Sequence, residues 1–296
     1  MSHSPAIAFF GTSDYAVMVL EALQQGNFLP KLIITTPDRP AGKGMKVTAP
    51  PVKIWAEKNT IKVLQPEKLK DPSFIQELTS GAFDLFIVVA YGKIIPQEII
   101  DLSPHGALNV HASLLPKLRG ASPIETAILE DLKHTGITIM LIDSEMDHGP
   151  IIAKQEVVVQ AWPPKARDLG KALVEAGGKL LVETIPTWLS GNIQPQPQDH
   201  TQATYTKKIV KEDGLIDFKA DPYLNFRKIQ AYADWPRTYF FAEKDSKKVR
   251  MVITEAEYKD NRLHILKVIP EGKNEMNFAA VRQLYQVPEG IDELYK

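Results

Sequence analysis

Apolar runs of strand length recur through the first half of the chain, and helix-like segments separate them. The runs are apolar at successive positions, which is the pattern of strands buried on both faces of a sheet. Alternation of such strands with helices is typical of an α/β fold with a parallel sheet covered on both sides. The predicted strands are residues 6–10, 31–35, 85–89, 107–110, 137–141 and 151–159. The predicted helices are residues 16–25, 51–59, 72–79, 96–101, 123–131 and, as one long helix, 169–189.

A stretch rich in glutamine and proline follows the long helix. It has little to bury, so it is predicted to be an extended linker. We therefore expect a Rossmann-like α/β domain over residues 1–192 and a linker over 193–204. The later chain has a helix-like segment and then short alternating segments broken by turns, which indicate a small β-rich, OB-like barrel domain over 205–275. The structure of residues 276–296 is left open. The elements predicted for the second domain are a helix at 222–231 and strands at 239–242, 248–258 and 262–269.

Composition narrows the class of protein. The formal net charge is -1, so any nucleic-acid partner would have to be held by local basic patches. The chain has no cysteine, which excludes disulfides and thiolate metal sites, and its histidines lack metal-ligand spacing, so we expect no metal. No apolar stretch reaches the ~20 residues that cross a bilayer, and the first residues do not resemble a secretory signal. We expect a soluble, cytoplasmic monomer that does not contact a membrane.

The first predicted strand ends in a glycine turn that opens a helix. Gly11 and Thr12 lie at this turn, where unpaired backbone amides can meet a ligand. The dinucleotide fingerprint G-x-G-x-x-G is absent, which counts against a Rossmann oxidoreductase. The alternative is a tight turn in which Ser13 or Asp14 caps the helix.

An asparagine and a histidine lie two residues apart at the end of the strand over 107–110. Asn109 and His111 therefore point to one face if the strand continues. In an open parallel sheet, ligands bind beyond the carboxyl ends of the strands. An amide donor can stabilise the oxyanion of an acyl-transfer intermediate, and an imidazole can take the proton from the attacking amine. An isolated pair of this kind is more often a hydrogen-bonded strand end, but together with the Ser-Leu-Leu-Pro that follows it at 113–116 the pair predicts acyl transfer to an amine.

A carboxylate could orient this imidazole. The segment 140–150 offers Asp143, at the end of an apolar run, and Asp147, just before a His-Gly-Pro turn. Spacing alone does not choose between them.

Two segments are candidates for contact with RNA. The loop over 38–46 carries Arg39, Lys43 and Lys46 among glycines and a proline, and a basic loop of this kind can follow phosphates. Lys207 and Lys208 follow a tyrosine near the start of the second domain. The alternative for both segments is an ordinary solvated surface.

The chain up to about residue 275 resembles the methionyl-tRNA formyltransferases, within the folate-dependent formyltransferase family. The resemblance lies in Gly11-Thr12 with Asp14, the loop over 36–44, residues 88–92, residues 109–120 and residues 146–150. The asparagine, histidine and aspartate set with Ser-Leu-Leu-Pro is common to formyltransferases that act on several amines. The early loop and the second domain point to tRNA. Lys43 stands where the family commonly has arginine, and Ser13 where it usually has proline.

The resemblance implies a catalytic trio of Asn109, His111 and Asp147, which favours Asp147 over Asp143. It implies that 10-formyltetrahydrofolate is the co-substrate and initiator methionyl-tRNA the partner, with RNA contacts from Arg39, Lys43, Lys46, Lys207 and Lys208. Two alternatives remain: a formyltransferase acting on a sugar nucleotide or other small amine, and a non-catalytic RNA-binding module. The residues implied to line the folate site are Ser113, Leu114, Leu115, Pro116, Val88, Val89, Ala90, Tyr91 and Gly92.

Overall fold

A computed structural model describes residues 4–41, 44–288 and 291. The chain divides into two compact units that interleave along the sequence. The first unit comprises Met1–Gly120, His134–Val158 and Gly170–Tyr205, and the second comprises Ala121–Lys133, Val159–Leu169 and Thr206–Lys296. The domain boundaries at 192 and 205 stay predictions.

A seven-stranded sheet forms the centre of the first unit, in the order β10-β9-β7-β6-β1-β2-β5. The strands from β5 to β7 pair in parallel, which confirms the predicted α/β class. At one edge β9 runs antiparallel to β7, and β10 runs antiparallel to β9. An apolar run has the same appearance in either direction, so the sequence pattern could not reveal this reversal. The strands are β1 (Ile7–Gly11), β2 (Leu32–Ile34), β5 (Lys62–Leu64), β6 (Leu85–Val89), β7 (Ala107–His111), β9 (Thr135–Leu141) and β10 (Ile151–Val157).

Helices cover the sheet because their small and apolar residues allow close packing. In α6, a Cβ added at Gly177 would lie 2.8 Å from side-chain atoms of both Ile137 and Val110, so this helix approaches β7 and β9 closely. A separate apolar cluster joins Phe74 of α3 and Ile99 of α4 to the sheet. The helices that contribute to this unit are α1 (Asp14–Gln25), α2 (Pro51–Lys58), α3 (Pro72–Ser80), α4 (Gln97–Ile100) and α6 (Ala166–Leu189).

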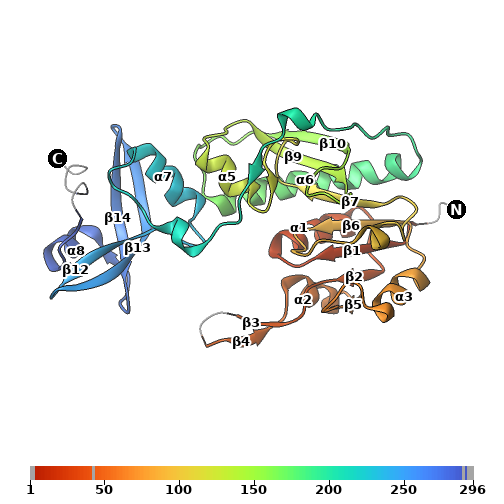
Figure 1. The fold of residues 1–296 in the computed structure, drawn as a ribbon, viewed down its shortest axis with the longest axis horizontal. Helices are drawn as coiled ribbons and strands as arrows, with labels where there is room; N and C mark the ends of the chain where they lie inside the picture. Colours follow the sequence, from red (N-terminus) through yellow and green to blue (C-terminus); the bar gives the residue numbers. More distant parts are fainter. Residues whose placement is uncertain (1–3, 42–43, 289–290, 292–296) are drawn as a thin grey trace. The chain divides into compact units, whose positions relative to one another are not determined.

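The segment predicted as a basic loop forms a hairpin instead, which corrects that expectation for its described residues. Strands β3 (Arg39–Ala41) and β4 (Lys46–Thr48) pair antiparallel, and Figure 1 shows them extending away from the sheet beside α2. Asp38 fixes the base of the hairpin, since it accepts hydrogen bonds from Lys53 Nζ at 2.8 Å and Gln65 Nε2 at 2.7 Å. These bonds, with that from Gln65 the larger cause, lower the pKa of the Asp38 carboxyl.

The second unit contains the antiparallel β domain that the sequence predicted. Its sheet has the order β12-β13-β14-β15, and its core includes Phe240, Met251 and Phe278. Phe278 belongs to α8, so part of the segment left open by the sequence packs into this core. The elements are α5 (Pro123–Leu129), η2 (Lys211–Gly214), α7 (Pro222–Ala231), β12 (Tyr239–Lys244), β13 (Lys247–Lys259), β14 (Arg262–Pro270), β15 (Met276–Asn277) and α8 (Phe278–Leu284).

Segment 193–204, predicted as a linker, has contacts of its own. Gln196 bridges to Ile151 at the start of β10, and a short helix, η1 (His200–Gln202), follows. Strands β8 (Arg119–Gly120) and β11 (Tyr205–Thr206) form a separate two-stranded sheet. Among the described helices, none combines the length and apolarity needed to cross a bilayer.

Candidate active site

Strand β7 presents Asn109 and His111 at the carboxyl end of the parallel part of the sheet. The two residues alternate with Leu108 and Val110, so their side chains share one face. His111 is only 6% exposed, and its Nε2 lies 2.9 Å from the carbonyl oxygen of Leu118. A carbonyl can only accept, so we assign a proton to Nε2. Nδ1 is then the ring nitrogen available for proton transfer.

Asp147 faces that nitrogen. Its Oδ1 lies 3.6 Å from His111 Nδ1, while its Oδ2 accepts a hydrogen bond of 2.7 Å from the backbone N–H of Gly120. The carboxylate is therefore held by one oxygen and directed at the imidazole with the other. Asp143, the alternative left open by spacing, instead lies 2.7 Å from Nδ1 of His148.

Two glycines make this arrangement possible. Gly120 has φ +112, a conformation that favours glycine and that directs its N–H toward Asp147. At Gly149 an added Cβ would lie 2.0 Å from the carbonyl oxygen of Leu141, so any larger residue would push the turn away from β9. The turn is further held by a 2.9 Å bond from the Leu141 N–H to the Pro150 carbonyl.

Sequence reasoning missed a buried arginine beside the site. Arg119 is 1% exposed, and its guanidinium donates to Gln198 Oε1, at 2.7 Å from Nη2 and 3.2 Å from Nε. The Gln198 amide nitrogen donates in turn to the carbonyls of Asp147 and Gly149, at 2.9 and 2.7 Å. Arg119 therefore supports the turn that carries Asp147 through one glutamine. No local pattern marks Gln198, because its partner lies 79 residues away.

The Ser-Leu-Leu-Pro segment divides into buried and partly open residues. Ser113 Oγ donates to the Lys117 carbonyl at 2.6 Å, and Leu115 packs in a cluster with Met140 and Ile151. Leu114 and Pro116 are half-buried. Ser113 and Leu115 thus fix the shape of the turn, and Leu114 and Pro116 are the side chains left partly open.

The residues at the end of β6 also divide into buried and exposed ones. Val88, Val89 and Tyr91 are buried, whereas Ala90 and Gly92 are exposed and have φ values of +44 and +82. The Tyr91 ring packs edge-on against Phe10, and burial raises the pKa of its phenol well above the usual range. The chain therefore turns outward at Ala90 and Gly92 while Tyr91 anchors it.

The basic residues predicted for RNA contact are exposed where the structure describes them. Arg39 and Lys46 lie on the β3–β4 hairpin, and Lys208 is also open to solvent. Lys207 forms an ion pair of 2.9 Å with Asp213. Lys43 lies outside the described residues.

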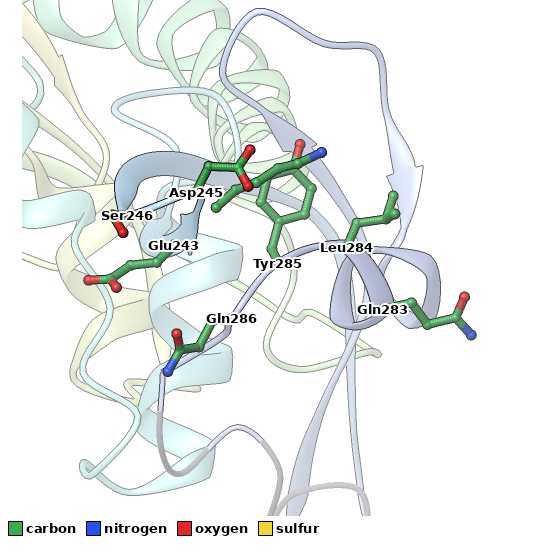
Figure 2. A pocket seen from close by; sticks show the side chains of 8 residues that line it. Glu243, Asp245, Ser246, Gln283, Leu284, Tyr285 and Gln286 are labelled. Atoms are coloured by element: carbon green, nitrogen blue, oxygen red, sulfur yellow. The ribbon is translucent and has the colours of Figure 1, made fainter.

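The second unit has a hollow whose residues are distant in the sequence from those of the candidate active site. The turn after β12 and the end of α8 form it (Figure 2), and it contains none of the candidate catalytic side chains. In the described chain, no group of three or more His, Asp or Glu residues is arranged to hold a metal ion. The chemistry available is therefore that of an imidazole, a carboxylate and an amide at one sheet edge, which suits proton transfer and oxyanion stabilisation during acyl transfer.

Comparison with known proteins agrees with this chemistry. The family model described as "Formyl transferase" matches residues 5–185, so the class defined by the fold and the site is that of a formyl transferase. Methionyl-tRNA formyltransferase from Chloroflexus aurantiacus is 43% identical over 237 residues, 79% of this chain and 76% of that one. The enzyme of the same name from Thermodesulfovibrio yellowstonii is 35% identical over 308 residues, 98% of this chain and 99% of that one. The chain therefore belongs to the methionyl-tRNA formyltransferase family.

A solved structure extends the comparison of the fold. A sugar N-formyltransferase from Shewanella has a TM-score of 0.64 and 16% identity, and the match covers 87% of this chain and 100% of that one. At this level of identity the likeness concerns the fold alone.

Proposed function

We propose that this protein transfers the formyl group of 10-formyltetrahydrofolate to the α-amino group of methionyl initiator tRNA, for translation initiation. The observation that carries the proposal is the facing pair of His111 Nδ1 and Asp147 Oδ1, 3.6 Å apart at the end of β7, in a chain of this family. The protein acts as a cytoplasmic monomer in this proposal.

The reaction forms a bond between the amine nitrogen and the formyl carbon, and it breaks the bond from that carbon to N10 of the folate. The amine loses a proton, and tetrahydrofolate leaves after N10 gains one. Asn109 donates to the oxyanion of the tetrahedral intermediate, and His111 in its protonated form adds a second donor. Asp147 orients the imidazole and assists the movement of the proton.

The local geometry supports these roles. His111 Nε2 is engaged by the Leu118 carbonyl, so Nδ1 is the nitrogen that exchanges a proton. The 3.6 Å separation from Asp147 exceeds an ordinary hydrogen bond, which leaves the first proton acceptor as either His111 or water held by Asp147.

The folate site is proposed at the two segments that follow β6 and β7. Ala90 and Gly92 are exposed beside the buried Tyr91, and Leu114 and Pro116 are half-buried beside the fixed Ser113 and Leu115. Such a mixture of fixed and open positions suits a flat heteroaromatic ring system. Val88 and Val89, the buried last residues of β6, complete the proposed site.

Initiator tRNA is proposed to contact the hairpin through Arg39, Lys43 and Lys46, and the start of the second unit through Lys207 and Lys208. The described members are exposed, and exposed basic side chains can neutralise backbone phosphates.

The test is formylation by the purified protein of methionyl initiator tRNA, glycinamide ribonucleotide and an amino-sugar nucleotide, each with 10-formyltetrahydrofolate. The proposal expects turnover with the charged tRNA at least about 100-fold above that with either small amine. Turnover restricted to a small amine would replace tRNA by that substrate, and no turnover with any amine would remove the enzymatic assignment.

A further inference from the structure

Two histidine rings are stacked beside the candidate active site. The centroids of His148 and His200 lie 4.1 Å apart, and their planes differ by 2°. His148 Nδ1 lies 2.7 Å from Asp143 Oδ2, and His200 Nδ1 lies 2.9 Å from Nη2 of Arg119. Each ring is therefore held at its Nδ1, His148 by a carboxylate of its own segment and His200 by an arginine that is distant in the sequence.

The hydrogen-bond partner of His200 determines which of its ring nitrogens carries the proton. A guanidinium only donates, so His200 Nδ1 must accept and the ring proton must be on Nε2. His200 is accordingly a neutral, flat ring.

The stack is accessible and adjoins the reacting groups. His148 directly follows Asp147, and its side chain is 29% exposed. His200 is exposed, and so is Tyr205, whose ring lies 5.9 Å from the guanidinium carbon of Arg119.

The charges around the stack indicate what it could bind. Asp143 contacts His148 directly, Glu145 Oε1 lies 3.9 Å from His148 Nε2, and Asp199 precedes His200. Arg119, the cation in contact with His200, is buried and also donates to Gln198, so the more exposed carboxylates disfavour a phosphate group at the stack. An uncharged planar base is not repelled by these carboxylates. Stacking on aromatic rings is the usual way in which proteins bind an unpaired base.

The proposed substrate has such a base close to the amine that reacts. The α-amine belongs to an amino acid esterified to the terminal ribose, so only the ester and that ribose separate it from the terminal base. When the amine lies at Asp147, the base must lie near the residues that flank Asp147.

We propose that His200, whose ring is stacked on that of His148, is a stacking site for the terminal adenine of the aminoacylated substrate. This inference rests on the proposed function and adds a base-binding site to it. Arg119 and Asp143 act as positioning residues that hold the two rings parallel.

Kinetics of His200→Ala and His200→Phe test the site, with intact methionyl initiator tRNA as substrate. Both variants lose the Nδ1 atom that accepts from Arg119, while Gln198 still accepts from it, but only the phenylalanine keeps a flat ring. We expect the alanine variant to raise KM for the tRNA about tenfold or more, with KM for 10-formyltetrahydrofolate unchanged, and the phenylalanine variant to restore most of that loss. His134→Ala, at an exposed histidine elsewhere, is the matched control.

A pair of minimal substrates separates the base from the rest of the tRNA. The wild type should prefer 3′-O-methionyl-adenosine over methionine methyl ester in kcat/KM, and His200→Ala should reduce that preference about tenfold. Equal KM values for wild type and His200→Ala, equal values for the alanine and phenylalanine variants, or an unchanged preference would each overturn the stacking site while leaving the proposed function intact. Failure of the wild type to formylate methionyl-tRNA would overturn both.

Discussion

The side-chain oxygen of Gln198 accepts hydrogen bonds from two nitrogens of Arg119, Nη2 at 2.7 Å and Nε at 3.2 Å. Because a guanidinium only donates, this contact fixes which end of the amide faces Arg119. The amide nitrogen must then point at the carbonyls of Asp147 and Gly149, as it does. A buried cation thus sets the position of the turn that carries the candidate catalytic carboxylate.

Replacement of Gln198 by leucine should loosen this turn. The change keeps most of the side-chain volume but removes the Oε1 atom that accepts from Arg119 and the amide nitrogen that donates to both carbonyls of the turn. We expect a loss of about 2–4 kcal/mol in the free energy of unfolding and a fall in kcat of roughly tenfold or more, measured by chemical denaturation and steady-state formylation.

Gln194→Leu is the matched control, since Gln194 is an exposed glutamine of the same segment. If Gln198→Leu had the stability and kcat of the control, the turn would not depend on this contact.

Replacement of His111 or Asn109 by alanine should remove a proton-transfer group or an oxyanion donor. Each variant should lose roughly 100-fold or more in kcat, measured with saturating methionyl-tRNA and 10-formyltetrahydrofolate. Since the two side chains act on one intermediate, the double variant should lose less than the product of the single losses. His134→Ala should keep wild-type kcat, and a His111→Ala variant with near-wild-type turnover would contradict the proposed mechanism.

Neutralisation of Arg39, Lys43 and Lys46 to glutamine should weaken tRNA binding. Each lost phosphate contact should reduce the slope of log affinity against log salt by up to about one unit, whereas folate affinity should stay constant because that site is proposed at other segments. The measurement is tRNA binding across a salt series.

The control for the hairpin variant replaces three other exposed lysines, Lys58, Lys70 and Lys171, which keeps the change in net charge similar. Identical affinity and slope for the two triple variants would exclude the hairpin from tRNA contact.

Glu125 offers a test by pH. Burial, with the charge of Asp234 as a lesser cause, raises the pKa of the Glu125 carboxyl above its usual range. The folded protein therefore holds this proton more tightly than the unfolded chain, so stability falls as pH rises from the unfolded pKa through the folded one. Glu125→Gln should raise the Tm at pH 8, and the gain should disappear near pH 4.

Thermal unfolding of Glu125→Gln and of Glu130→Gln, an exposed position just after the same helix, checks this expectation. A gain that persisted unchanged at pH 4, or that appeared equally in the control, would show that ionisation of Glu125 is not its cause.

The sequence predicted the elements that have a strong local pattern. Strands such as β1 and β6 are continuous apolar runs, and each was predicted within one residue of its observed bounds. The β3–β4 hairpin was missed because glycine, proline and lysine are frequent in it. β5 was missed because it is an edge strand with no fully buried residue, whereas β2, equally short, is apolar and buried throughout. These elements depend on pairing with a neighbouring strand more than on the strand propensity of their own residues.

The residues of the candidate site likewise differ in whether a local sequence pattern could predict them. Asn109 and His111 lie two residues apart on one strand and are followed by Ser-Leu-Leu-Pro, so a local pattern was enough to select them as candidates. Spacing could not decide between Asp143 and Asp147, because the distinction depends on which turn reaches β7. Gln198 and His200 lie in the segment that the sequence predicted as a linker. Their partners, Arg119 and His148, are distant in the sequence, so no local pattern could predict these contacts.

Helix α5 has a consequence for the order in which the chain can fold. Its last carbonyl, that of Leu129, accepts a hydrogen bond from Arg227, 98 residues later, and Asp131 accepts one from Tyr223. A ribosome that adds about 5–20 residues per second needs roughly 5–20 s to produce that partner helix. During this interval Ile124 and Ile128, buried in the finished protein, have no α7 beside them. The second unit therefore completes its core only late in synthesis, although one of its helices is among the earlier segments to emerge.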